Sequence, residues 1–191
     1  PYFNGHFSNG PVWVDYLAAE LRVPVQDYAL GGALTGRVNL FDDPGIPAEF
    51  PGLLDEIDMF LALNGGVADP RALYVVWAGA NDFFLAPAPA TIAPAVTNLV
   101  TAVRTLAERG ARHIVVPTMP DLGLTPYALG KHVGDPVTQL SAAYNQVLDS
   151  ALDSLASAGI PTIRMDAFAT LRKMVAQPAQ LLESGFDEPE V

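Results

Sequence analysis

An amide and a carboxylate stand side by side in the segment VVWAGANDFF, residues 75–84, where Asn81 precedes Asp82. The β-forming run just before them, residues 73–77, is apolar on both faces, as in a strand of a parallel sheet that helices cover on both sides. Ligands of such sheets bind at the carboxyl ends of the strands. Because the amide is a neutral hydrogen-bond donor and the carboxylate an acceptor, Asn81 and Asp82 are candidates for a binding or catalytic site.

The glycine-rich segment DYALGGALTG, residues 27–36, is a second candidate. Gly31, Ala33 and Gly36 nearly match the spacing of a dinucleotide-binding fingerprint. That motif needs a helix at this point and an acidic residue about 20 positions later, after another strand. Here the chain continues into the loop-forming residues FDDPGIPAEFPG instead, so we reject the nucleotide interpretation. Two readings stay open: a turn that needs small residues and positive φ, or a site where Gly31 or Gly32 offers its N–H to a ligand.

Helix-like and strand-like segments alternate along the chain and predict the scaffold for these residues. Apolar spacing and helix-terminating residues predict helices over 12–21 with Pro11 in the first turn, 48–63, 91–109, 137–158 and a last one capped by Asp166. The expected strands are residues 25–30, 73–77, 113–116 and 160–165, and residues 118–135 read as a Gly- and Pro-rich loop. This alternation predicts the α/β class with a parallel sheet. We expect a single domain over residues 1–191, because the length fits one domain and no linker or repeat interrupts it.

Composition excludes several classes of function. The formal net charge is −11 and the 191 residues include only 10 Lys and Arg, which argues against binding to nucleic acid or to anionic lipid. The sequence contains no run of 18 or more apolar residues, which is the length that a membrane-spanning helix needs. Cysteine is absent, so neither disulfides nor thiolate chemistry are possible within these residues.

Four motifs follow one another in a fixed order: FSNGPVWVDYLA (7–18), YALGGALTG (28–36), WAGANDFF (77–84) and VPTMPDLGLTP (116–126). Together they resemble the GDSL, or SGNH, family of serine esterases and lipases, and more closely its bacterial phospholipase/lecithinase/haemolysin-like branch. Residues 140–152 and 165–189 are similar to the same branch, so the resemblance covers essentially the whole chain. It implies a flavodoxin-like three-layer α/β/α fold with a parallel sheet.

The resemblance also implies a mechanism. In this family a serine attacks an ester carbonyl, and preorganised donors stabilise the oxyanion that forms. By position in the motifs, Gly32 and Asn81 correspond to two of those donors. For Asp82 we expect support of the Asn81 loop or a turn cap rather than a chemical role. Phe83 and Phe84 either wall an acyl pocket or belong to the core. The implied substrates are acyl esters, from short-chain esters to lipids, and no metal or organic cofactor is implied.

Two family elements are absent from these residues: the Gly-Asp-Ser that carries the nucleophile and the Asp-x-x-His that carries the base. The resemblance places them before Pro1 and after Val191, so we expect the chain to be the middle of an enzyme. The preceding segment would also carry the first strand, which lies between strands 25–30 and 73–77 in the sheet order 2-1-3-4-5. Without it two buried edges lose their partner, and we expect the chain alone to be poorly folded.

The remaining serines and histidines have expectations of their own. We interpret Ser8 as a turn or cap residue and His113 as structural, whereas His132, in the long loop, is a weaker candidate for contact with substrate. Four serines are expected to be solvated on a helix, namely Ser141, Ser150, Ser154 and Ser157. His6 and Asp27 stand where members of the branch usually have Arg and Asn.

The sequence therefore favours a serine ester hydrolase. One alternative is a non-catalytic lipid- or glycan-binding module on the same fold, and another is a flavodoxin-like domain that binds a nucleotide or flavin, although no phosphate loop supports it. Members of this branch are often exported, so we expect a secreted or cell-surface protein. The acyl chain, the alcohol part and the oligomeric state are not indicated.

Overall fold

The computed structural model describes residue 3, residues 7–42 and residues 50–177. A parallel sheet forms its centre, in the order β1 (Leu73–Val75), β2 (His113–Pro117), β3 (Ile163–Met165). Leu73 pairs with His113 across β1 and β2, and Val115 pairs with Ile163 across β2 and β3. The parallel α/β architecture expected from the sequence is confirmed.

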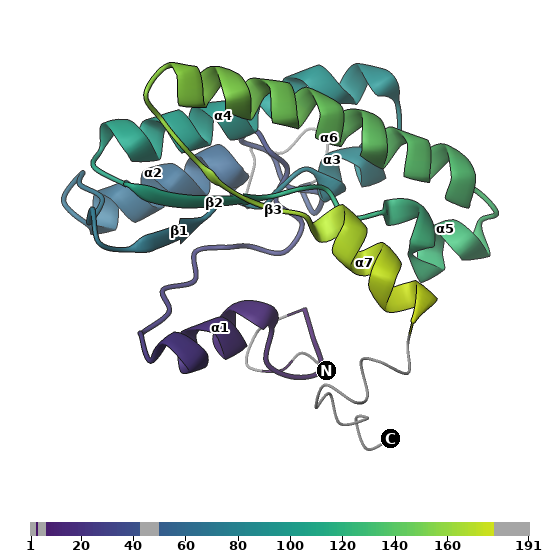
Figure 1. Ribbon diagram of the computed structural model, residues 1–191, viewed down its shortest axis with the longest axis horizontal. Helices are drawn as coiled ribbons and strands as arrows, with labels where there is room; N and C mark the ends of the chain where they lie inside the picture. Colours follow the sequence, from purple (N-terminus) through teal and green to yellow (C-terminus); the bar gives the residue numbers. More distant parts are fainter. Residues whose placement is uncertain (1–2, 4–6, 43–49, 178–191) are drawn as a thin grey trace.

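Helices cover both faces of this sheet (Figure 1). Three of them lie on one face: α2 (Leu53–Leu63), α4 (Ile92–Glu108) and α6 (Gly134–Ser157). The other face is turned towards α1 (Trp13–Leu21) and α7 (Ala167–Ala176), which lie below the strands in Figure 1. The short α3 (Ala80–Leu85) follows β1 at the carboxyl end of the sheet, where ligands bind in this class of fold.

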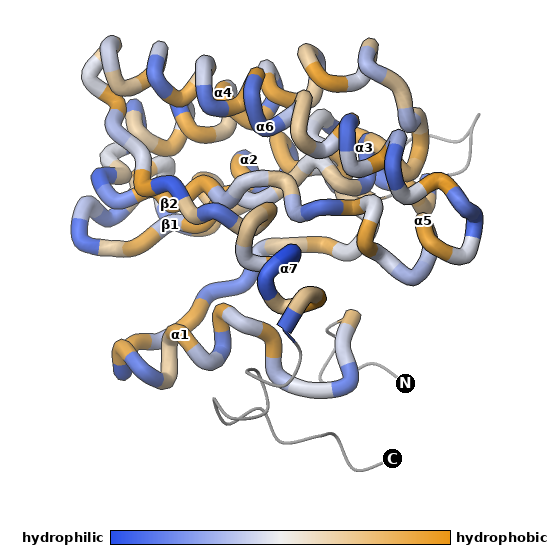
Figure 2. The backbone as a smooth tube through the Cα atoms, turned by 45° about the vertical axis from the view of Figure 1, so that its right-hand side comes forward, coloured by the Kyte–Doolittle hydropathy of each residue, from blue (hydrophilic) through white to orange (hydrophobic). Residues whose placement is uncertain are grey.

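The core lies between the sheet and the layer of α2, α4 and α6. Its apolar side chains repeat along α4 with helical spacing, and Figure 2 shows the same alternation of hydrophobic and hydrophilic positions along α4 and α6. The side chains buried most completely in this core include Leu99, Val103, Ile114, Val116, Tyr144, Leu148 and Leu152. The same helices were expected from the apolar stripes of the sequence.

Residues 25–30, which were expected to form a strand, do not form one. Figure 1 shows this stretch leading from the end of α1 back towards the sheet. A strand needs a hydrogen-bonded neighbour, and here a cavity of about 510 Å³ separates the stretch from β1. The prediction was wrong for the described chain because the apolar pattern reports the side chains, not the presence of a partner.

Element boundaries differ from the expected ones by a few residues. Helix α1 begins at Trp13, so Pro11 precedes its first turn, and α2 begins at Leu53 because the N-terminal part of the expected helix is loop or lies outside the described residues. The expected loop 118–135 contains two short helices, η3 (Leu122–Leu124) and α5 (Pro126–Gly130), as well as the start of α6. The Asp166 cap is confirmed: its carboxylate accepts the Ala169 N–H at 2.8 Å.

A fully buried carboxylate ties the carboxyl end of the sheet to α7. Asp121, in the loop after β2, accepts hydrogen bonds from the Arg172 guanidinium at 2.6 Å, the Thr138 hydroxyl at 2.6 Å and the Gly123 N–H at 3.1 Å. The three donors come from α7, α6 and η3. A buried charge is tolerated when it is paired and hydrogen-bonded, as this one is.

We expect Asp121→Ala to destabilise α7 by about 3 kcal/mol, because it leaves three donors without their acceptor. The measurement is hydrogen exchange of the α7 amides. The matched control is Asp153→Ala, which breaks an exposed ion pair with Arg164 and should cost less than about 1 kcal/mol. Equal exchange rates in the two variants would contradict this role of Asp121.

Candidate active site

Asn81 lies in the first turn of α3 and lines a small cavity at the carboxyl end of β1. The cavity measures about 220 Å³ and is also lined by Trp77, Met119 and Glu56. The Asn81 side-chain amide donates a hydrogen bond to the Ala33 carbonyl at 2.9 Å. An Asn amide carries two N–H donors, so this contact fixes the side chain and leaves the second N–H for a ligand.

Asp82 holds the glycine-rich turn to α3. Its carboxylate accepts hydrogen bonds from the Thr35 N–H at 3.0 Å and from the Thr35 hydroxyl at 2.6 Å, and both residues are buried. The Thr35 hydroxyl in turn accepts a hydrogen bond from the Asn98 amide on α4 at 3.3 Å. Asp82 therefore supports a loop, as expected, but the loop is the glycine-rich turn, about 47 residues earlier in the chain, rather than its own.

Gly32 occupies a backbone conformation that only glycine adopts easily. Its φ is +83°, and a Cβ at this position would lie 2.7 Å from the Phe41 ring and still closer to the Asn39 side-chain oxygen. The Gly32 carbonyl accepts the Leu40 N–H at 2.9 Å, whereas its own N–H has no acceptor among the residues that the structure describes. The sequence reading of a turn that needs positive φ is confirmed, and the N–H stays available as a donor.

The buried side chain of Asn39 fastens this turn from the inside. Its amide donates to the Gly31 carbonyl at 3.1 Å and to the Pro51 carbonyl at 3.2 Å. Its oxygen accepts the Phe41 N–H at 3.1 Å. These side-chain contacts add to the backbone hydrogen bonds of the turn, such as Leu34 N–H to the Val38 carbonyl at 3.0 Å, because residues 28–36 form no strand and include one isolated β-bridge, between Ala33 and Asn39.

Asn81 contacts the glycine-rich turn next to Gly32. Asn81 reaches the carbonyl of Ala33, the neighbour of Gly32 in the chain, and Ala33 lines the same cavity. Gly32 is not among the residues that line it. The structure therefore brings the asparagine and the glycine-rich turn together, with Gly32 next in the chain to a residue that lines the cavity.

A buried glutamate contacts the turn at its other end. Glu56, on α2, accepts the Leu30 N–H at 2.8 Å. Burial raises the pKa of Glu56 to about 7, with smaller upward contributions from the charges of Asp27 and Asp55, against the opposing effect of the Leu30 hydrogen bond. The raised pKa puts the charge change of Glu56 near neutral pH, at a side chain that contacts Leu30, two residues before Gly32.

Close packing positions the start of α3. Gly79, at φ +120°, precedes the helix, and a Cβ there would lie 2.9 Å from both the Tyr144 hydroxyl and the Met119 methyl group. The Tyr144 hydroxyl donates to the Ala78 carbonyl at 3.3 Å, and burial raises its pKa above the ordinary value. Helix α6 thereby fixes the backbone from which Asn81 and Asp82 project.

The two aromatic residues after Asp82 have different surroundings. Phe83 is buried in the core, edge-on to Tyr144 with ring centroids 5.7 Å apart. Phe84 is 50% exposed and lies edge-on to Tyr127 of α5 at 5.5 Å. Of the two sequence readings, core packing applies to Phe83, and Phe84 is a surface residue.

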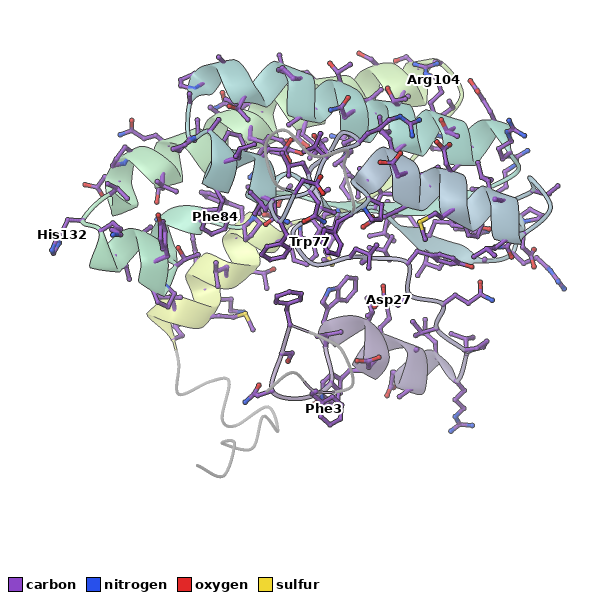
Figure 3. All side chains as sticks on the ribbon, turned by 180° about the vertical axis from the view of Figure 1, so that it is seen from behind. Phe3, Asp27, Trp77, Phe84, Arg104 and His132 are labelled. Atoms are coloured by element: carbon purple, nitrogen blue, oxygen red, sulfur yellow. The ribbon has the colours of Figure 1, made fainter. Side chains whose placement is uncertain are left out.

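The other serines and histidines are accounted for without catalysis. Ser8 accepts the Gly10 N–H in a turn, as expected, and His132 is exposed at φ +56°, pointing outward at the rim of the molecule in Figure 3.

The prediction that Ser141 is solvated was wrong: it is buried, and its hydroxyl donates to the Val137 carbonyl and accepts from the Leu122 N–H, because it faces η3. His113 is exposed at the start of β2. His6 lies outside the described residues. The helical serines at 150, 154 and 157 donate to carbonyls one turn earlier.

Sequence reasoning missed Thr35, Asn39 and Glu56. Glu56 did carry a signal, since it is three residues from Leu53 on the apolar face of α2, where an acid is unusual. Thr35 and Asn39 gave none, because polar residues in a glycine-rich loop are ordinary. Among the residues that the structure describes, no group of three or more His, Cys, Asp or Glu side chains could hold a metal ion.

A protein-family model matches nearly the whole chain. The family model described as GDSL-like Lipase/Acylhydrolase matches residues 1–180. The chain belongs to the GDSL-like lipase/acylhydrolase family. The resemblance seen in the motifs is confirmed, and the family's fold agrees with the parallel sheet and its helices.

Some of the curated relatives carry names from ester chemistry. A phosphatidylcholine-sterol acyltransferase of Aeromonas hydrophila is 31% identical over 164 residues, 84% of this chain and 48% of that protein. The esterase EstA of Pseudomonas aeruginosa is 37% identical over 128 residues, 62% of this chain and 18% of that protein. An uncharacterised protein from the trpE–trpG intergenic region of Pseudomonas putida is 35% identical over 163 residues, 81% of this chain and 27% of that protein. The chain thus spans half or less of these relatives.

We expect Gly32→Ala to loosen the glycine-rich turn, because alanine at positive φ costs about 1–2 kcal/mol and its Cβ overlaps Asn39 and Phe41. The amides of Leu34 and Leu40, which bond across the turn, should exchange at least about tenfold faster. Gly65→Ala is the control, since Gly65 has φ +67° and open space around it. If both variants leave the two amides unchanged, the steric argument fails.

We expect Glu56→Gln to change how stability depends on pH. The folded-state pKa lies above the unfolded value, so the contribution of Glu56 is fully present below about pH 4.5 and is lost as pH rises through about 7. The variant should therefore be more stable than the wild type at pH 8, by on the order of 2 kcal/mol, with no such gain at pH 4.

Urea unfolding of the longest polypeptide that the gene encodes, from pH 4 to 8, measures this difference. Glu108→Gln, at the exposed end of α4, controls for the loss of one negative charge. A constant difference between wild type and Glu56→Gln across this range would contradict the assignment.

Proposed function

We propose that this chain forms part of a serine hydrolase that cleaves acyl esters through an acyl-enzyme intermediate. Membership in the GDSL-like lipase/acylhydrolase family supports the reaction class. The observation that carries the site assignment is the Asn81 amide, fixed on Ala33 at the cavity with one N–H to spare. Gly32, beside Ala33 and with an N–H that has no acceptor among the described residues, is the second donor. No step requires a metal or organic cofactor.

In the proposed reaction a serine hydroxyl attacks the ester carbonyl while a histidine takes its proton. The carbonyl oxygen becomes an oxyanion, and the Asn81 and Gly32 N–H groups donate to it. The C–O bond to the alcohol then breaks, the histidine protonates the leaving alcohol, and water hydrolyses the acyl-serine by the same steps. An amide suits this role because it donates while remaining neutral.

The serine and the histidine of this mechanism come from polypeptide outside the 191 residues, because these residues hold neither a Gly-Asp-Ser nor an Asp-x-x-His element. The serine N–H is then the third oxyanion donor. The substrates are acyl esters, from short-chain esters to lipids, which fits the names of the phosphatidylcholine-sterol acyltransferase and EstA relatives. The described helices include none that is both long and apolar enough to cross a membrane. We place the protein outside the cell or at its surface, as for many members of this branch.

Reading the gene outward from both ends of this sequence tests the proposal first. An in-frame Gly-Asp-Ser upstream and Asp-x-x-His downstream, each within about 50 codons, are the expected result, since one βα unit takes about 30 residues. A start codon and a stop codon that bracket these residues would instead favour a non-catalytic lipid- or glycan-binding module.

In the full gene product we expect Asn81→Ala to lower kcat for a chromogenic acyl ester by about 10²–10³, with little change in KM, because the lost hydrogen bond forms only in the transition state. Asn64→Ala, at the exposed C-terminal end of α2, is the control and should keep wild-type kcat. An unchanged kcat in Asn81→Ala, or a change in KM alone, would remove Asn81 from the oxyanion hole.

A further inference from the structure

The two adjacent glycines of the glycine-rich turn form the centre of a four-residue β-turn. The Ala33 N–H donates to the Leu30 carbonyl at 3.1 Å. This bond closes the turn, so Gly31 and Gly32 are its second and third residues. Gly32 has φ +83°, whereas Gly31 is not among the residues with positive φ. A positive φ at the third residue alone is the signature of a type II turn.

A type II turn differs from the commoner type I turn in the direction of its central peptide unit. The two dihedrals that flank this unit differ by about 150–170° between the two types, so its N–H and C=O point to opposite sides in the two forms. Glycine has no Cβ and permits either form at both central positions. In this protein the central unit carries the Gly31 carbonyl and the Gly32 N–H, so a contact must select its direction.

The Asn39 side chain makes that contact. Its amide donates to the Gly31 carbonyl at 3.1 Å. Because the peptide unit is planar and trans, the Gly32 N–H points to the side opposite that carbonyl, away from Asn39. A type I turn would bring this N–H towards the Asn39 amide, and two donors would then face each other. The hydrogen bond from Asn39 therefore favours the form in which the Gly32 N–H points away from it.

Asn39 is itself held rigidly. The residue is only 2% exposed, its second amide N–H donates to the Pro51 carbonyl at 3.2 Å, and its oxygen accepts the Phe41 N–H at 3.1 Å. A backbone carbonyl only accepts and a backbone N–H only donates, so these partners fix which end of the side-chain amide is nitrogen. Both amide donors and the oxygen are used. The side chain cannot rotate to follow a reversed peptide unit without breaking these bonds.

The direction of the Gly32 N–H matters because the proposed function uses it as an oxyanion donor. If the central unit reversed, a carbonyl oxygen would replace the N–H, and its partial negative charge would repel the oxyanion. The ends of the turn have their own contacts: Glu56 accepts the N–H of the first residue, and Asn81 donates to the carbonyl of the last. Among the described residues, the hydrogen bond that involves the central unit is the one from Asn39.

We propose that Asn39 is a positioning residue for ester hydrolysis, which holds the Gly31 carbonyl and thereby keeps the Gly32 N–H directed at the oxyanion. This role rests on the proposed function, because it requires Gly32 to be an oxyanion donor. A hydrogen bond at the carbonyl of a peptide unit also polarises its N–H, which strengthens the donor. Asn39 is not among the residues that line the cavity, so it acts through the peptide unit and not on the substrate.

The test compares Asn39→Asp with Asn39→Ala in the full gene product. Aspartate keeps the oxygen that accepts from Phe41, but its second oxygen repels the Gly31 carbonyl and accepts the Gly32 N–H, so we expect the peptide unit to reverse. For a chromogenic acyl ester kcat should fall by about 10²–10³, as for the loss of one oxyanion donor, with little change in KM. Asn39→Ala removes the contact without attracting the N–H, so its kcat should lie between those of Asn39→Asp and the wild type. A role in stability alone would leave kcat of the folded variants unchanged.

Hydrogen exchange of the Gly32 amide reports the direction of the peptide unit without any substrate. In the wild type this amide has no acceptor among the residues that the structure describes. In folded Asn39→Asp it gains one and should exchange at least about tenfold more slowly. A turn that is merely loosened would exchange faster. Faster or unchanged exchange in this variant would overturn the proposal.

Asn98→Ala is the matched control. Asn98 also donates to this turn, to the Thr35 hydroxyl at 3.3 Å, but it does not contact the central peptide unit. The control should keep a kcat close to that of the wild type. Equal losses of kcat in Asn98→Ala and Asn39→Ala would overturn the proposal. Because Asn39→Ala introduces no buried charge, this comparison decides the matter even if Asn39→Asp does not fold.

The outcomes separate this role from the proposed function. If the wild-type gene product does not hydrolyse the ester, the proposed function fails, and the positioning role fails with it. If Asn81→Ala lowers kcat but neither change at Asn39 does, the ester hydrolase stands and Asn39 only stabilises the turn.

Discussion

The pairing of Asp82 with Thr35 is the interaction on which the candidate site depends. The glycine-rich turn belongs to no helix and to no strand of the sheet: backbone hydrogen bonds from Leu53 and Leu54 tie it to α2, and the hydrogen bonds to α3 come from the Asp82 and Asn81 side chains. Asp82 accepts two hydrogen bonds from Thr35, and both groups are buried, where such bonds resist competition from water. The adjacent Asn81 can reach Ala33 because this pair holds the turn in place.

The neighbouring amide and carboxylate of Asn81 and Asp82 therefore have different roles. Asn81 presents a donor at the cavity, and Asp82 secures the backbone that Asn81 touches. Residues from three other elements complete the framework: Asn98 on α4, Glu56 on α2 and Tyr144 on α6. Each belongs to the layer of helices that packs against the sheet, so these contacts fix the turn to the packed core.

Apolar spacing and residue type along the sequence were enough to predict several elements of the fold. The helices that became α4 and α6 and the buried strand β2 follow from apolar spacing, and the Asp166 cap follows from its residue type. Asn81 and Gly32 were predicted from motif order, and their chemical roles remain predictions. The prediction of a strand over residues 25–30 was wrong because a strand forms only with a hydrogen-bonded partner. The prediction that Ser141 is solvated was wrong because η3 covers this position of the helix. Glu56 was missed because burial at one position depends on the whole fold.

The contact between Trp13 and Trp77 gives the protein an optical reporter of its own. These are the two tryptophans of the 191 residues, and both line the cavity of about 510 Å³ beside β1. Trp77 is 40% exposed, and its indole N–H is held by the Thr118 carbonyl at 3.1 Å, so its orientation is fixed while its surroundings can change. Indole emission depends on contact with water. The tryptophan fluorescence of the chain, excited selectively over its six tyrosines, thus reports the hydration of the cavity beside β1 without a label.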